Sequence, residues 1–212
     1  MKTVGIVAGG PKNELPSFSE YLSIDFWIGV DEGCLHLKSQ NINPDLAVGD
    51  FDSMTETELS EISQVSEVLQ FPNDKDQTDL EIGIDQAIKM DPDLVLIFGA
   101  TGGRLDHEWM NINLLKKFSE KRIDAWMINK HNELTIKYPD TYKLEKDLRY
   151  KYISFLPMTE KVEHLSLKGF RYELEDENIS SDSSLTVSNE WNEKKGTYSF
   201  STGILLVVKS RD

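Results

Sequence analysis

The stretch Gly49-Asp50-Phe51-Asp52-Ser53, which follows the apolar run Asp45-Leu46-Ala47-Val48, decides how the first half of this chain folds. The apolar run predicts a short buried strand that leads directly into two carboxylates. In an extended segment their i, i+2 spacing directs Asp50 and Asp52 to the same side, roughly 6–7 Å apart. Such a pair is unfavourable unless a cation lies between the acids or one keeps its proton. Taken alone, the stretch is better explained as a solvated turn in which Ser53 caps the next helix.

Short apolar segments alternate with amphipathic segments up to about residue 129. This alternation predicts a mainly parallel sheet with helices on both faces. The predicted strands are Thr3 to Ala8, Phe26 to Val30, Asp45 to Val48, Val68 to Phe71, Leu94 to Phe98 and Ile123 to Ile128. The predicted helices are Leu35 to Lys38, Glu56 to Val65, Leu80 to Met90, and a long one marked by Leu105, Trp109, Ile112, Leu115 and Phe118.

Polar side chains directly follow several of these strands. Asp31, the Asp50–Asp52 pair, the Asp74–Asp79 segment and the Gly99–Asp106 segment all occupy such positions. Because ligands of open α/β sheets bind beyond the carboxyl ends of the strands, these groups are expected to meet at one edge. This convergence predicts a ligand site lined by carboxylates and glycines.

The segment Asp76-Gln77-Thr78-Asp79 opens a predicted helix and allows two interpretations. Asp76 could be the N-cap with Asp79 at N3, which needs no ligand. Alternatively, Asp76 and Asp79 share a helical face beside the other carboxylates and serve a cation. Lys75 could contact phosphate as a point charge, or could be solvated.

A second turn, Gly99-Ala100-Thr101-Gly102-Gly103-Arg104, joins a strand to a helix N-terminus, where backbone N–H groups favour an anion. It matches neither the P-loop pattern nor Gly-x-Gly-x-x-Gly. A tight turn is the plain alternative, and Arg104 favours phosphate because a guanidinium fork matches phosphate oxygens. Asp106 would be repelled by phosphate unless a metal or a second substrate occupies it.

The formal net charge is −14, and no basic stripe offsets the acids, which argues against nucleic acid or an anionic membrane as a partner. A phosphorylated substrate is still possible if Mg²⁺ bridges it to carboxylates. No apolar run approaches the roughly 20 residues of a membrane span. Cys34 is the only cysteine, so an internal disulfide is impossible, and a cytoplasmic location is expected. The histidines lack zinc-like spacing, which argues against a zinc site.

The second half, residues 133–212, predicts a small antiparallel β-sandwich or barrel. The predicted strands are Leu134 to Tyr138, Tyr150 to Phe155, Val162 to Leu167, Phe170 to Leu174, Leu185 to Ser188, Thr197 to Phe200 and Ile204 to Val208. Lys168-Gly169 and Ser201-Thr202-Gly203 are expected to be hairpin connections, and Glu173 to Asn178 a solvated loop. The hydroxyl, amide and aromatic groups of Leu185 to Trp191 suit a small heteroaromatic ligand, although turn chemistry explains them nearly as well.

In combination, the motifs resemble those of the thiamine pyrophosphokinases. The resemblance covers nearly the whole chain and rests on Gly29-Val30-Asp31, Gly49-Asp50-Phe51-Asp52-Ser53, Asp74-Lys75-Asp76-Gln77-Thr78-Asp79, Gly99-Ala100-Thr101-Gly102-Gly103-Arg104-Leu105-Asp106-His107, and Val187-Ser188-Asn189. It implies conversion of ATP and thiamine to AMP and thiamine diphosphate, with Mg²⁺. It also implies a homodimer with shared active sites, an α/β nucleotide-binding and catalytic domain at residues 1–132, and a thiamine-binding and dimerisation domain at residues 133–212.

The resemblance also implies roles for individual residues. The implied catalytic residues are Asp50, Asp52, Asp79 and Asp106, and Asp50, Asp52 and Asp79 are the implied metal ligands. The implied ATP contacts are Asp31, Lys75, Thr78 and Arg104, and the implied thiamine contacts are Tyr172, Thr186, Ser188 and Asn189. The thiamine hydroxyl would attack the β-phosphorus of ATP in line. Asp79 or Asp106 could accept its proton, and no general base is identified.

Two other function classes fit parts of the sequence. A nucleotide-sugar transferase could use Asp50-x-Asp52 as its metal motif, but it leaves the Asp74–Asp79 segment and the β-rich second half unexplained. A non-catalytic module that binds a nucleotide or thiamine could carry a vestigial acidic pocket, but the complete acidic set argues against it.

Overall fold

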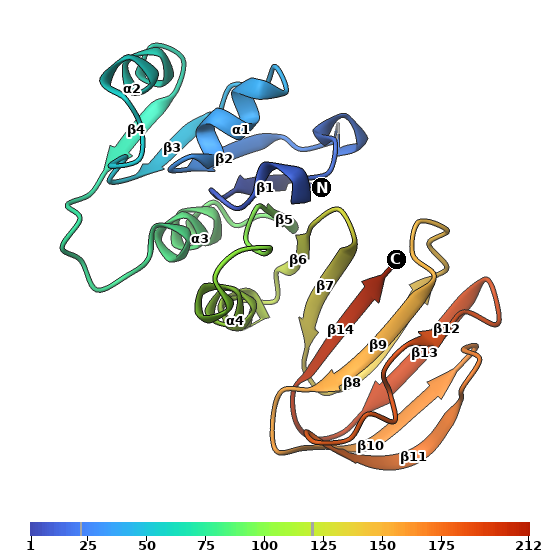
Figure 1. Cartoon of the computed structure of the whole chain (residues 1–212). Helices are drawn as coiled ribbons and strands as arrows, with labels where there is room; N and C mark the ends of the chain where they lie inside the picture. The colour runs from blue at the N-terminus through green and yellow to red at the C-terminus, as the bar shows by residue number, and fades with distance from the viewer. Residues whose placement is uncertain (22, 120) are drawn as a thin grey trace. The chain divides into compact units, whose positions relative to one another are not determined.

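The chain forms two compact units, Met1–Lys130 and His131–Asp212 (Figure 1). The computed structural model describes residues 1–21, 23–119 and 121–212. Within those residues, no helix is both long enough and apolar enough to cross a membrane. The sequence predicts the division after residue 132, and the contacts within the chain divide it after Lys130.

The first unit contains the predicted parallel sheet. Its strands lie in the order β6-β5-β1-β2-β3-β4, and every neighbouring pair is parallel. Their bounds are β1 Thr3–Val7, β2 Phe26–Val30, β3 Leu46–Gly49, β4 Glu67–Gln70, β5 Leu94–Phe98 and β6 Asp124–Ile128. The chain runs outward from β1 to β4 and then returns to the other side of β1 with β5. The strand order therefore reverses between β1 and β5, which is where such sheets bind ligands.

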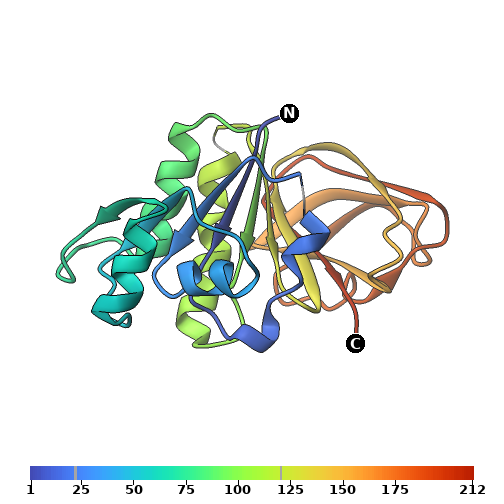
Figure 2. The same ribbon diagram turned by 90° about the horizontal axis from the view of Figure 1, so that it is seen from above.

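Helices cover both faces of this sheet. They are α1 Gly33–Ser39, α2 Glu56–Ser63, α3 Asp79–Lys89, α4 Leu105–Leu114 and α5 Lys116–Ser119, with short 3₁₀ turns at Lys12–Glu14 and Phe18–Tyr21. Gly83 of α3 lies against the side chains of Ile28 and Val30, whereas Cys34 of α1 lies against Gly29. Successive strand residues point to opposite faces, so α1 and α3 cover opposite faces of β2 (Figure 1 and Figure 2).

Three local predictions in the first unit are wrong. Thr55, not Ser53, caps α2, in a capping box with Glu58. Thr78, not Asp76, caps α3. The predicted long helix is interrupted at Leu115, and the apolar spacing that marked it does not trace one buried face, since Leu105 is 80% and Trp109 59% exposed.

The second unit contains two antiparallel sheets, in the orders β12-β9-β14-β7 and β11-β10-β13-β8. Its strands are β7 Asn132–Lys137, β8 Asp140–Glu145, β9 Tyr152–Pro157, β10 Lys161–Lys168, β11 Leu174–Ser180, β12 Asn189–Glu190, β13 Lys195–Phe200 and β14 Leu205–Ser210. Phe155 and Val207 from the first sheet join Leu165 and Tyr198 from the second in one buried core. This arrangement confirms the predicted antiparallel sandwich.

Several boundaries in the second unit differ from the prediction. The acidic stretch Glu173 to Asn178, predicted as a loop, lies mostly in β11, while Leu185 to Ser188, predicted as a strand, is a turn. β11 is an edge strand whose side chains at 175–178 are exposed, so its backbone pairs with β10 while its acids stay solvated. Ser201-Thr202-Gly203 connects β13 to β14 in the other sheet and therefore does not form a hairpin.

Candidate functional site

Loops at the carboxyl edge of the parallel sheet surround a pocket of about 560 Å³ in the first unit. Its lining comes from the segments after β1, β2 and β5 and from the start of α3, including Gly9, Asp31, Thr78, Gly99 and Arg104. This is the point where the strand order reverses. The volume is in the range of small-molecule and cofactor sites.

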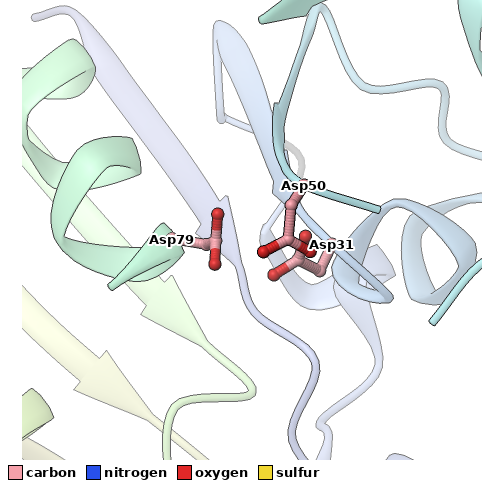
Figure 3. A group of neighbouring side chains, drawn as sticks. All are labelled: Asp31, Asp50 and Asp79. Atoms are coloured by element: carbon pink, nitrogen blue, oxygen red, sulfur yellow. The ribbon is translucent and has the colours of Figure 1, made fainter. Parts of the chain in front are cut away.

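Three carboxylates meet beside this pocket. Asp31 follows β2, Asp50 follows β3 and Asp79 begins α3, and the closest oxygens of the three lie within 4.8 Å of one another (Figure 3). Gly49 makes this approach possible, because a Cβ atom there would lie 1.8 Å from Asp31 Oδ1. The acids that follow the strands therefore lie together as predicted, and Asp31 contributes one of the three clustered carboxylates.

Asp52 lies outside this group in the part of the chain that the structure describes. Phe51 adopts a left-handed conformation with φ of 59° and is buried in a small core with Cys34, Ala47 and Ile62. The expected extended geometry at Asp50–Asp52 is therefore wrong. Asp52 is exposed and accepts a hydrogen bond from Asn73 Nδ2 at 3.3 Å.

Lys75 supplies the cation that this cluster needs. Its Nζ lies 3.0 Å from Asp50 Oδ2 and 3.0 Å from Asp79 Oδ1, and its side chain is only 11% exposed. The hydrogen bond from Lys75 is the main cause of the lowered pKa of Asp50. The pKa of Lys75 is raised, because its contacts to Asp79 and Asp50 outweigh burial, which acts in the opposite direction.

The pKa of Asp31 is raised to about 7, first by burial and then by the negative charges of Asp79 and Asp50. Asp79 Oδ1 is buried and, among the described residues, has no hydrogen bond of good geometry, although Lys75 Nζ lies 3.0 Å from it as an ion-pair partner. Clustered carboxylate oxygens, one of them buried and without a hydrogen bond, are suitable ligands for Mg²⁺.

The Gly99–Arg104 turn lines the pocket, but its anion-binding groups already have internal partners. The N–H groups of Gly102 and Gly103 both donate to Glu108 Oε1, at 2.9 and 2.6 Å. Arg104 forms a two-pronged ion pair with Asp106, at 3.2 and 2.7 Å, in which both side chains are largely exposed. The hydrogen bond from Arg104 lowers the pKa of Asp106 to about 2.

Some pocket residues were not predicted from the sequence. Glu108, in the first turn of α4, accepts hydrogen bonds from the N–H groups of Gly102 and Gly103. His36 also lines the pocket, and its Nε2 lies 2.9 Å from the carbonyl oxygen of Gly10. Neither residue belongs to a motif that spacing alone could reveal. Thr78, an expected ATP contact, lines the pocket, and its hydroxyl also accepts the Glu81 N–H as the cap of α3.

The four predicted thiamine contacts lie close together in the second unit but differ in exposure. Asn189 is buried: it donates to the carbonyl oxygen of Tyr172 at 2.7 Å and accepts the N–H groups of Tyr172 and Glu190 at 3.0 and 2.9 Å. Thr186 is also buried, and its hydroxyl donates to the carbonyl oxygen of Phe155. Ser188 and Tyr172 are exposed. Thus two of the four fix the segment, and two present side chains to solvent.

Comparison with known proteins gives a consistent result across both units. A family model described as the thiamin pyrophosphokinase catalytic domain matches residues 19–127, and one described as its vitamin B1 binding domain matches residues 141–205. Thiamine pyrophosphokinase of Bacillus subtilis is 44% identical over 214 residues, covering 100% of each chain.

Solved structures agree with these matches. The crystal structure of thiamine pyrophosphokinase from Bacillus subtilis has a TM-score of 0.93 at 43% identity and covers 100% of each chain. That of thiamin pyrophosphokinase from Geobacillus thermodenitrificans has a TM-score of 0.91 at 38% identity, covering 99% of this chain and 98% of the other.

Proposed function

Because this chain belongs to the thiamine pyrophosphokinase family, we propose that it transfers the pyrophosphoryl group of ATP to the hydroxyl of thiamine, giving thiamine diphosphate and AMP. The observation that carries this proposal within the structure is the Asp31, Asp50 and Asp79 cluster beside a ligand-sized pocket. Polyphosphate chemistry needs a cation at such a place.

We assign the Mg²⁺ site to Asp31, Asp50 and Asp79, in place of the expected set with Asp52. Their oxygens are close enough to share one ion, and Asp79 Oδ1 is buried without a hydrogen bond among the described residues. Mg²⁺ bound there would offset the negative charge of the phosphates. Asp52 is held outward by the buried Phe51 and has no direct part in this site.

Other residues of the pocket bind and orient the ATP phosphates in this proposal. Arg104 and the N–H groups of Gly102 and Gly103 are the anion-binding groups of the turn, and each exchanges an internal carboxylate for a phosphate. Asp106 orients Arg104 before ATP arrives. It is poorly suited to accept the thiamine proton, because its pKa is about 2.

The thiamine contacts divide into two kinds. Tyr172 and Ser188 face solvent and can touch a ligand, and the exposed Leu185 and Val187 add apolar surface beside Ser188. Asn189 holds the backbone of Tyr172, so it acts as a positioning residue. An aromatic ring beside hydroxyl and apolar groups suits a small heteroaromatic ligand.

We further propose a cytoplasmic homodimer whose active sites each take residues from two chains. The exposed apolar side chains of Leu105, Trp109 and Met110 on α4 support an association of chains. Mixing Asp79→Asn with Tyr172→Ala under subunit exchange should restore activity, since one site of each heterodimer carries neither lesion. Heterodimers that form and stay inactive would show that each site lies within one chain.

The direct test is incubation with ATP, Mg²⁺ and thiamine, followed by chromatography for AMP and thiamine diphosphate. Asp31→Asn and Asp52→Asn separate the two proposed metal sets, because both remove one carboxylate from neighbouring loops. We expect Asp31→Asn to lose at least about 100-fold in turnover and Asp52→Asn to lose less than about 5-fold. Equal losses would restore Asp52 to the site, and absence of both products from the unaltered protein would refute the proposed reaction.

A further inference from the structure

Lys75 lies where a bound cation would lie. Its ammonium group is 3.0 Å from an oxygen of Asp50 and 3.0 Å from an oxygen of Asp79, and both acids belong to the cluster of Asp31, Asp50 and Asp79. The side chains of Lys75, Asp50 and Asp79 are 11%, 12% and 19% exposed, so water screens these charges only in part.

The lysine is also free to leave. It lies in the segment between β4 and α3, outside any helix or strand, on a flexible four-carbon stem. Lys75 also donates a hydrogen bond of 3.3 Å to the carbonyl oxygen of Pro72. Its contacts with the two carboxylates are ion pairs at 3.0 Å each, and the one with Asp50 is also a hydrogen bond. The ammonium group is therefore held chiefly by charge, as an ion would be.

We propose that Lys75 is a built-in counter-cation, which neutralises the acidic cluster in the ligand-free protein and competes with the metal for Asp50 and Asp79. This inference rests on the metal site proposed above. It follows that the metal binds weakly until a polyphosphate offers the ammonium group a new partner. Metal and nucleotide therefore bind as a coupled pair, and Lys75 is the residue that couples them.

Lys117 provides a matched comparison. Its Nζ also lies between two carboxylates, at 2.9 Å from Glu81 Oε1 and 2.7 Å from Asp85 Oδ1, on the same helix that Asp79 begins. No third acid of the described residues completes a metal-sized group there. Removing Lys117 therefore changes the net charge and frees two carboxylates, but it does not free a metal site.

The test measures Mn²⁺ binding by electron paramagnetic resonance in the absence of nucleotide. We expect Lys75→Met and Lys75→Gln to bind Mn²⁺ at least about 10-fold more tightly than the unaltered protein, because they remove the ammonium group that competes with the metal. The competition is expected to be strong, since a partly buried ion pair is stronger than an exposed one. Lys75→Arg, which keeps the charge, and Lys117→Met should stay within about 3-fold of it. Unchanged or weaker Mn²⁺ binding by folded Lys75→Met and Lys75→Gln would overturn the proposal.

A double variant distinguishes failure of this proposal from failure of the metal-site assignment on which it rests. Adding Asp50→Asn to Lys75→Met should abolish the gain in Mn²⁺ affinity. If the gain in Mn²⁺ affinity persists, the ion binds elsewhere and the assigned metal ligands are wrong. If Asp50→Asn abolishes Mn²⁺ binding but Lys75→Met leaves the affinity unchanged, only the role of Lys75 is refuted.

A measurement on the unaltered protein avoids any effect of substitution on folding. Acetylation of lysines, followed by mass spectrometry, should find Lys75 protected without metal and at least about 5-fold more reactive at saturating Mg²⁺, because the freed amine gains access to water. Lys117 should react equally under both conditions. A Lys75 that stays protected at saturating Mg²⁺ would show that the two cations do not exchange.

Discussion

Replacing Asn189 with Ala should destabilise the second unit strongly, although the family resemblance implies that this residue contacts thiamine. The side chain is 2% exposed and joins three backbone groups: the N–H and the carbonyl of Tyr172 and the N–H of Glu190. Truncation leaves all three without this partner. At about 1 kcal/mol for each lost hydrogen bond, the expected loss in the free energy of unfolding is about 3 kcal/mol.

The assay is urea unfolding followed by hydrogen exchange of peptides from β9 and β14, which reports the second unit by itself. Ser188→Ala is the matched control, because that neighbouring side chain is exposed, and we expect a change within about 0.5 kcal/mol. A loss below about 1 kcal/mol in Asn189→Ala would refute the positioning role and return Asn189 to the list of direct ligand contacts.

Three further predictions concern the first unit. The pKa of Asp31 is raised from 3.8 to about 7, so the folded state holds this proton more tightly and loses stability as pH rises from about 4 to about 7. With metal chelated, Asp31→Asn should therefore be more stable than the unaltered protein at pH 8 by about 1–2 kcal/mol after solvent screening, and this difference should vanish by pH 4. A difference in urea midpoint between the two proteins that is the same at both pH values would contradict this. Gly49→Ala should displace Asp31, because its Cβ would lie 1.8 Å from Oδ1, and abolish Mn²⁺ binding while circular dichroism stays native; retained Mn²⁺ affinity would argue against the assigned ligands. Burial raises the pKa of Cys34 to about 12, so Cys34 should resist a thiol reagent at pH 8 until urea unfolds the chain, and rapid native labelling would count against that burial.

The apolar strands made it possible to predict which residues lie at the carboxyl ends of the parallel strands. Leu94–Phe98 and Phe26–Val30 have the predicted bounds, because continuous apolar runs between turn residues leave little choice of structure. Once these strands are parallel, residues that follow them must meet at one edge. The meeting of Asp31, Asp50 and Asp79 follows from that topology.

The position of Asp52 outside the acidic cluster could not be predicted from spacing. It depends on Phe51, which has a left-handed backbone and is buried in one cluster with Ala47 of the preceding strand and with Cys34 and Ile62 of two helices. Contacts between distant residues decide this conformation, and no local pattern contains them.

The other differences between the predictions from sequence and the structure have similar causes. Leu105 and Trp109 repeat at helical spacing, but spacing cannot say whether another surface covers the face they share. The acids of β11 suit a loop by composition, yet an edge strand tolerates them because one of its faces stays in water. Glu108 reaches the glycine N–H groups only because the turn and α4 fold together.

The central position of β14 has a consequence for biosynthesis. Residues 205–210 form β14, which lies between β7 and β9. The group of strands β12-β9-β14-β7 therefore lacks an inner strand until the ribosome has made these residues. β12, which begins with Asn189, pairs with β9 and gains a firm support only then. The first unit uses only residues that emerge earlier and can fold during translation. The segment assigned to thiamine is therefore expected to mature last, and a nonsense codon just before residue 205 would leave a folded first unit without a functional second one.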